Sequence, residues 1–280
     1  MQITYAVPSF TDKLYQDQSS VRKCARAWAM LHPQRPKKVA LLLHGYAGYP
    51  GELIRPGIDL YQAGWDVYTP RLPGHGTSGE DFLQSRGSDW LGTFDAAYRY
   101  LLEAGYQEIS LVGHSMGTLM AIILASRYSV DRIALVAPAL IIPSLPGRQL
   151  RFLRHFVQKK HVGWQADPAY RFLYEGDADD DAYLGEHYWS YIYPKQLWEL
   201  EKLRRLATSL VEHLEADTLT ITGGKDTIVD EAGALLVASK QAGENRHLHI
   251  PLGGHYLLYD KDQASQDATI EAIVAWLERT

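Results

Sequence analysis

The strongest constraint on the fold of this chain is a five-residue motif between a strand-like run and a helix-like run. Residues 109–112 are mostly apolar and branched, as in a buried strand, and residues 118–124 continue as an apolar run spaced for a helix. Between the two runs, Gly113–Gly117 reads Gly-His-Ser-Met-Gly. This pattern is typical of a sharp turn that exposes its serine hydroxyl at the end of a strand, with glycines where backbone must pass closely. We therefore interpret Ser115 as a candidate nucleophile.

Strand-like and helix-like segments alternate along most of the chain. Besides the run before Ser115, short apolar segments predict strands at residues 39–43, 65–69, 132–137, 218–222 and 246–250. Helical spacing lies between or after them, as in residues 89–103 and from about residue 264 onward. Such alternation predicts parallel strands with helices on both faces of the sheet. Residues 24–30, where large and small side chains alternate, are predicted to form an edge strand.

The alternation stops after residue 137 and resumes after residue 205. We therefore predict three segments: residues 1–137 as the first part of the core, 138–205 as an inserted cap, and 206–280 as the second part of the core. The inserted segment is rich in aromatic residues, some expected to line a pocket and others to form the cap's own interior. They are Tyr170, Phe172, Tyr174, Tyr183, Tyr188, Trp189, Tyr191, Tyr193 and Trp198.

Three residues that each follow a predicted strand could act together as a catalytic triad. In parallel sheets, ligands bind at the carboxyl ends of the strands, where Ser115, Asp226 and His255 are all expected. A serine hydroxyl needs a base to remove its proton, a role that suits His255, and Asp226 would orient the imidazole. The main-chain amides of Tyr46 and Met116 are candidates for the oxyanion hole that stabilises a tetrahedral intermediate.

Other residues compete for these roles. Asp230 lies four residues after Asp226, but it precedes an apolar helical run and is better suited to cap that helix. His247 and His249 lie within a predicted strand rather than after it. The remaining loop histidines have no carboxylate at metal-ligand spacing, so we interpret them as hydrogen-bonding scaffold: His44, His75 and His114.

These motifs resemble those of α/β-hydrolases of the carboxylesterase and monoacylglycerol-lipase type. The matching segments, in order, are His44–Gly48, Arg71–Gly76, Gly113–Gly117, Gly223–Asp226 and Gly253–His255. The order serine, aspartate, histidine is also that of the α/β-hydrolases. The resemblance implies a mostly parallel sheet with helices on both faces, a cap over the acyl pocket, and ester hydrolysis without metal or cofactor. It does not extend to the first 30 or so residues.

Composition excludes several other classes. A net charge of −5 and an isoelectric point near 6.1 argue against nucleic acid as a partner. The single cysteine, Cys24, cannot form an intramolecular disulfide and suits a reducing compartment. No apolar run approaches the roughly 20 residues that cross a bilayer, and the first residues do not resemble a signal peptide. We therefore expect a cytoplasmic protein without stable membrane insertion.

The sequence thus predicts a serine esterase for small-molecule esters of short or medium acyl chain, including monoacylglycerol as a candidate. Two alternatives stay open. The same triad could serve other acyl chemistry, such as thioester or amide cleavage, acyl transfer or perhydrolysis. A non-catalytic ligand-binding protein could also use this fold. Dehalogenases and epoxide hydrolases are disfavoured, because they need an aspartate where Ser115 stands.

Overall fold

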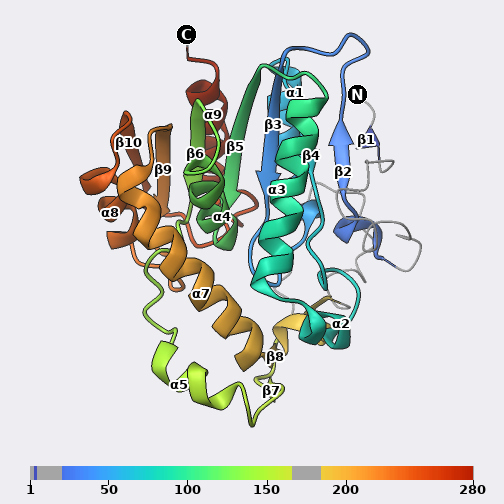
Figure 1. The fold of residues 1–280 in the computed structure, drawn as a ribbon, viewed down its shortest axis with the longest axis vertical. Helices are drawn as coiled ribbons and strands as arrows, with labels where there is room; N and C mark the ends of the chain where they lie inside the picture. Colours follow the sequence, from blue (N-terminus) through green and yellow to red (C-terminus); the bar gives the residue numbers. More distant parts are fainter. Residues whose placement is uncertain (1–2, 5–20, 166–183, 280) are drawn as a thin grey trace.

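The structure is a computed structural model that describes residues 3–4, 21–165 and 184–279. In these residues, six neighbouring parallel strands form most of an eight-stranded sheet (Figure 1). Two further strands, the first two in the chain, extend the sheet at one side in antiparallel pairing. In spatial order the strands are β1 (Ile3–Thr4), β2 (Trp28–Met30), β4 (Asp66–Thr69), β3 (Lys38–Leu43), β5 (Glu108–His114), β6 (Arg132–Val136), β9 (Asp217–Gly223) and β10 (Asn245–Ile250).

Strand β3 illustrates why these segments form the middle of the sheet. Its apolar residues are completely buried, because β3 pairs with β4 on one side and β5 on the other and is covered on both faces. Val39, Leu41 and Leu43 pack into the hydrophobic core on one face of the sheet. Ala40 and Leu42 pack into the core on the other face, as the two-residue period of a strand requires.

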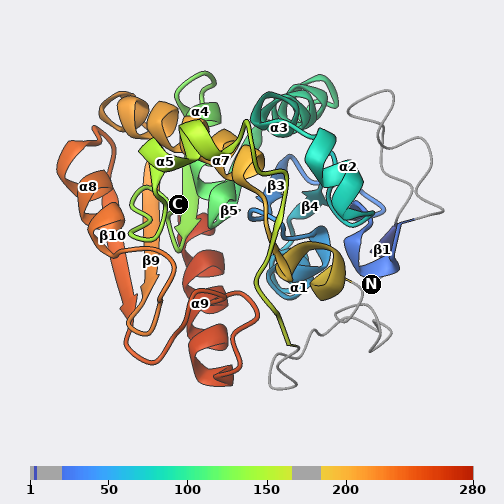
Figure 2. The ribbon, with the colours of Figure 1, turned by 90° about the horizontal axis from the view of Figure 1, so that it is seen from below.

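Helices cover both faces of the sheet, as Figure 2 shows. One face is covered by α1 (Ile54–Gln62), preceded by the 3-10 turn η2 (Pro50–Leu53), and by α9 (Gln263–Leu277). The other face carries α3 (Gly87–Glu103), α4 (Met116–Ala125), α7 (Pro194–Leu210) with the 3-10 turn η4 (Val211–His213), and α8 (Ala232–Lys240). The predicted mostly parallel sheet with helices on both faces is confirmed. Within the described residues, none of these helices combines the length and the hydropathy needed to cross a bilayer.

The segment between β6 and α7 lies beyond the carboxyl ends of the strands, below the sheet in Figure 1. It contains α5 (Gly147–Leu153), the π-helical turn η3 (Gly185–Trp189) and an antiparallel pair, β7 (Lys160–His161) and β8 (Tyr191–Ile192). The short helix α2 (Gly79–Gln84), which follows β4, lies at the same end. Residue 205, where the sequence predicts the cap to end, lies inside α7. Of the predicted pocket aromatics, Tyr170, Phe172, Tyr174 and Tyr183 lie outside the described residues.

One predicted element differs from the structure. The edge strand expected at residues 24–30 is wrong in both length and position. Its first part forms the 3-10 turn η1 (Lys23–Ala25), and only Trp28–Met30 is extended. This strand, β2, pairs with β4 on one side and with β1 on the other, so it is not an edge. Its outer partner is only two residues long, too short to leave a periodic signal in the sequence.

Candidate active site

The turn from β5 to α4 places Ser115 in a backbone conformation that is rare for a residue with a side chain. Its φ is 53° and its ψ is −116°, outside the common regions for L-residues. The turn is tight because the start of α4 packs directly on the end of β3. A Cβ atom on Gly117 would lie 2.1 Å from the carbonyl oxygen of Leu43, and one on Gly113 would lie 2.6 Å from the main chain of Gly117. Both glycines are therefore required by packing, and Ser115 is left half-buried at the carboxyl end of the strand.

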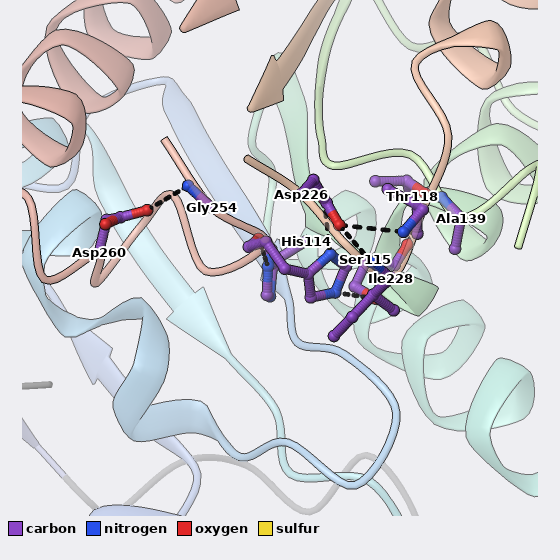
Figure 3. Close-up of polar contacts among 10 residues, drawn as sticks. His114, Ser115, Thr118, Ala139, Asp226, Ile228, Gly254 and Asp260 are labelled. Atoms are coloured by element: carbon purple, nitrogen blue, oxygen red, sulfur yellow. Dashed lines mark hydrogen bonds and ion pairs between the residues drawn. The ribbon is translucent and has the colours of Figure 1, made fainter. Parts of the chain in front are cut away.

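The structure brings Ser115, His255 and Asp226 together in one hydrogen-bonded chain (Figure 3). The Nε2 atom of His255 lies 3.0 Å from Ser115 Oγ, and its Nδ1 atom lies 2.8 Å from Asp226 Oδ2. Because the carboxylate can only accept, Nδ1 carries a proton, which leaves Nε2 of a neutral ring free to accept from the serine hydroxyl. The three side chains come from loops that follow β5, β10 and β9, which lie far apart in the sequence.

Asp226 and Asp230 make different contacts. Asp226 Oδ1 accepts the main-chain N–H groups of Ile228 and Val229, at 2.8 and 3.0 Å, while Oδ2 faces His255. Burial alone would raise the pKa of Asp226. The interaction with His255, together with the two main-chain hydrogen bonds, outweighs burial and holds the pKa below its usual value. Asp230 Oδ1 instead accepts the N–H of Ala232, the first residue of α8, at 2.8 Å.

The two candidate oxyanion donors lie in the segments next to Ser115 in sequence and in space. Met116 is the first residue of α4, so its N–H has no intrahelical acceptor. Tyr46 lies in the turn after β3, which is closed by a bond from Gly48 N to Gly45 O at 3.2 Å. This turn lies against the nucleophile, since a Cβ on Gly45 would be 3.3 Å from the Cβ of Ser115. The ring of Tyr46 packs edge-on against aromatic rings of α2 and α3.

The three other histidines that the sequence assigns to scaffold are buried and neutral. Burial lowers the pKa of His75 and of His114 to about 3, and it lowers the pKa of His44 well below its usual value. His44 accepts the N–H of Leu72 on Nε2 at 3.3 Å, and its Nδ1 donates to Gly45 O at 3.1 Å. The ring therefore ties the loop after β3 to the loop after β4. Within the described part of the chain, no three His, Cys, Asp or Glu side chains are placed to hold a metal ion.

A cavity of about 610 Å³ opens directly onto Ser115 and His255. Its wall is mainly apolar and combines core residues with residues of the segment before α7. Other lining residues include Tyr46, Ile142, Leu145, Trp164, Tyr188, Trp189, Tyr191, Ile192, Leu197, Leu200, Ile228 and Val229. The predicted aromatics Tyr188, Trp189 and Tyr191 are thus cavity residues. Tyr193 is buried against Phe82 instead, and Trp198 stacks beneath the guanidinium groups of Arg154 and Arg205.

Sequence reasoning missed part of the cavity wall. Glu52, Tyr256 and Tyr259 all line the cavity, and none of them belongs to the motifs. The Glu52 carboxylate is 4% exposed and packs against Gly48, where a Cβ atom would lie only 2.7 Å from Oε2. It accepts a hydrogen bond from Tyr259, whose pKa is raised well above its usual value, chiefly by burial. A signal was present for Tyr256, which directly follows His255.

Sequence comparison identifies the family to which this architecture belongs. Residues 34–262, well over half of the chain, match the family described as serine aminopeptidase, S33. The chain belongs to this S33 family. The matched range includes all five residues that the sequence predicts for the site: Tyr46, Ser115, Met116, Asp226 and His255.

Individual relatives of this S33 chain match shorter segments. A carboxylesterase of Bacillus subtilis (strain 168) is 31% identical over 85 residues, which cover 30% of this chain and 35% of that protein. A thermostable monoacylglycerol lipase of Bacillus sp. (strain H-257) is 37% identical over 89 residues, which cover 31% of this chain and 35% of that protein. The matches therefore span about a third of the length of these curated relatives.

Solved structures extend the similarity to nearly the whole fold. A structure of metagenome-derived lipolytic enzymes has a TM-score of 0.78 at 21% identity, covering 93% of this chain and 100% of that chain. A soluble variant of monoglyceride lipase from Saccharomyces cerevisiae has a TM-score of 0.72 at 17% identity, covering 94% and 97%. At such identities the structures show the α/β-hydrolase fold alone. Together with the family match, they confirm the predicted resemblance to carboxylesterases and monoacylglycerol lipases.

Proposed function

We propose that this chain hydrolyses carboxylic esters of small or medium acyl chain through an acyl-enzyme on Ser115. The observation that carries the proposal is the continuous relay from Ser115 Oγ to His255 Nε2 at 3.0 Å, and from His255 Nδ1 to Asp226 at 2.8 Å. The relay opens into a mainly apolar cavity. A nucleophile, a base and a group that orients the base are the three parts that this chemistry requires.

Acylation begins when Ser115 Oγ attacks the carbonyl carbon of the ester and passes its proton to His255 Nε2. Asp226 stays ionised, because its pKa lies below the usual value, and it stabilises the imidazolium. The main-chain N–H groups of Tyr46 and Met116 stabilise the oxyanion. The imidazolium then protonates the leaving oxygen as the bond from carbonyl carbon to that oxygen breaks, and the alcohol departs. Water repeats the sequence on the acyl-enzyme, which releases the carboxylic acid and restores the serine hydroxyl.

The cavity supports an acyl chain of limited length. Its volume of about 610 Å³ lies in the range of small-molecule sites, and aromatic side chains form much of its wall. Each buried methylene contributes up to about 0.8 kcal/mol, or roughly a fourfold gain in kcat/KM, until the cavity is full. Beyond that length, overpacking opposes binding. We propose that residues 138–205 act as the cap that sets this limit.

The competing functions differ in what they do with the same serine. Thioester or amide cleavage and acyl transfer would use the same acyl-enzyme with other leaving groups or acceptors. Because the family is described as serine aminopeptidase, amides of amino acids should be tested beside the esters. A non-catalytic ligand-binding protein would bind esters without turnover. Assaying matched p-nitrophenyl esters, thioesters and anilides side by side, with and without an added alcohol acceptor, separates these cases.

The nucleophile is tested with Ser115→Ala. We expect the variant to fold like the wild type, to lose at least about 10³-fold in kcat/KM, and to escape labelling by a fluorophosphonate. Intact-mass detection of one phosphonate on the variant would show that another residue is the nucleophile. Rapid labelling of the wild type without turnover of any ester would favour the ligand-binding alternative.

The acyl pocket is tested with a homologous series of soluble p-nitrophenyl esters. We expect kcat/KM to rise, peak at a short or medium chain, and then fall. Leu145→Trp, which adds volume inside the cavity, should move the peak to shorter chains. Leu206→Trp changes a 38% exposed leucine of α7 outside the cavity and should leave the profile unchanged. A profile that still rises at long chains, or a Leu145→Trp profile identical to the wild type, would contradict this pocket.

A further inference from the structure

The residue directly before the nucleophile contacts the main chain of the proposed base. His114 is only 2% exposed, and its Nε2 atom lies 3.0 Å from the carbonyl oxygen of His255 (Figure 3). A carbonyl oxygen only accepts, so Nε2 carries the proton and donates it to this bond. The last residue of β5 is therefore tied directly to the loop between β10 and α9.

The surroundings of His114 keep its ring neutral. Burial lowers its pKa to about 3, and the neighbouring ring of His255 acts in the same direction. With the proton on Nε2, the other nitrogen is unprotonated, and Nδ1 has no hydrogen-bond partner within the described residues. The titratable groups that face the ring from the adjoining elements are His44, Glu52, Asp226, His255, Tyr256 and Tyr259. A neutral ring adds no positive charge beside the base, so it does not oppose the imidazolium that forms there.

The loop that carries His255 is held on both sides of that residue. Asp260 Oδ2 accepts the N–H of Gly254 at 2.7 Å, which closes the loop upon itself. Such a bond shapes the loop but does not locate it relative to the nucleophile. The bond from His114 supplies that link, because it joins the loop to the residue whose backbone continues into Ser115. The base therefore has a direct hydrogen bond to the strand that carries the nucleophile, in addition to the bond from Lys225 N to Gly253 O at 2.8 Å, which ties the same loop to the loop after β9.

We propose that His114 is a positioning residue, which holds the main chain of His255 so that its Nε2 atom stays in line with Ser115 Oγ. This role rests on the proposed function of the triad. The positioning role requires a hydrogen-bond donor at the position of His114 Nε2. Loss of that donor should lower kcat more than it changes KM. Displacements of about 1 Å in a reacting group can reduce rates by about 100-fold, so one misplaced hydrogen bond behind the base has a measurable effect.

Three substitutions that differ in where they place a donor test this role. His114→Leu removes the donor and replaces the imidazole with an apolar side chain of similar size. His114→Gln places an amide N–H near the position of Nε2, and His114→Asn carries the same amide one methylene shorter. We expect kcat to fall about 10- to 100-fold for Leu and Asn with KM changed little, and most of the loss to be recovered by Gln. Urea unfolding of each variant identifies those that are folded under the assay conditions.

A folded Leu variant with wild-type kcat, or a Gln variant no better than Asn, would overturn the proposal. A measurement on the intact wild type covers the case in which the variants do not fold. Nitrogen-15 histidine spectra should show His114 protonated on Nε2, and a proton on Nδ1 alone would disprove the bond. Wild-type protein that neither turns over an ester nor reacts with a fluorophosphonate would refute the proposed function, and this role with it. Turnover by the wild type together with an unaffected Leu variant would refute the positioning role alone.

Discussion

His75 should make the folded protein lose stability as the pH falls below about 6.5. This residue is fully buried after β4, where its Nδ1–H donates to Pro73 O at 3.0 Å. Its ring lies edge-on to those of Phe82 and Trp90, at 5.0 and 5.5 Å between centroids. Burial is the main reason that its pKa falls to about 3, and the guanidinium of Arg71 lowers it further. The folded site therefore excludes a proton that the unfolded chain binds readily.

The size of the effect follows from the two pKa values. Above pH 6.5 the imidazole of His75 is neutral in both states, so it contributes no pH dependence. Between pH 6.5 and 3 only the unfolded state binds the proton, and the free energy of unfolding falls by about 1.4 kcal/mol for each pH unit. At pH 5 the loss amounts to about 2 kcal/mol, a substantial part of the 5–15 kcal/mol typical of folded proteins.

The assay is urea unfolding, followed by tryptophan fluorescence, at pH 7.5 and at pH 5. His75→Gln removes the titrating group, so its destabilisation relative to the wild type should be about 2 kcal/mol smaller at pH 5 than at pH 7.5. His213→Gln removes a histidine whose side chain is 65% exposed and should follow the wild-type pH dependence. Parallel curves for the wild type and His75→Gln would show that His75 is protonated equally in both states, which would refute the reasoning.

Three further outcomes are expected. Asp226→Asn should reduce kcat by about 10⁴-fold, because the tautomer of His255 is no longer fixed. Asp230→Asn should change activity and stability little, because the asparagine oxygen still accepts the N–H of Ala232, whereas Asp230→Ala should cost about 1 kcal/mol of stability. A larger loss of kcat from Asp230→Asn than from Asp226→Asn would reassign the acid. Ester hydrolysis should survive prolonged dialysis against a chelator, and loss of activity with recovery on one added metal would contradict this. Gly117→Ala should destabilise the fold, since its Cβ would lie 2.1 Å from a main-chain oxygen, and an unchanged urea midpoint would disprove the contact.

The core of the fold could be predicted because its sequence patterns are local. A run such as Val39–Leu43 is apolar at every position and can only be buried on both faces, and the Gly113–Gly117 turn requires a strand before it and a helix after it. Ser115, Asp226 and His255 could be assigned to the ends of strands because each of them follows such a local pattern. The side chains meet because parallel strands end at one edge of the sheet.

Other features depend on packing that the sequence does not express. Glu52 follows a loop, where an acidic residue is usually exposed, yet its carboxylate is buried because Gly48 leaves space and Tyr259 donates a hydrogen bond. The sequence predicts β2 at an edge because the two-residue strand beside it has no detectable pattern. The predicted cap boundary at residue 205 falls inside α7, because charged and apolar side chains alternate along this helix without a break that would mark its ends.

Helix α7 has a practical consequence for exchanging the substrate-binding segment with that of a relative. Its first half contributes Leu197 and Leu200 to the cavity, whereas Leu203 and Ala207 are buried in the main hydrophobic core. A chimera joined at residue 205 would cut the helix between Leu203 and Ala207, within the part that packs into the core, and the residues taken from the relative would have to rebuild part of that packing. A junction placed before Pro194, at the start of the helix, keeps that packing intact. The exchangeable unit is therefore shorter than the region in which the sequence alternation is lost.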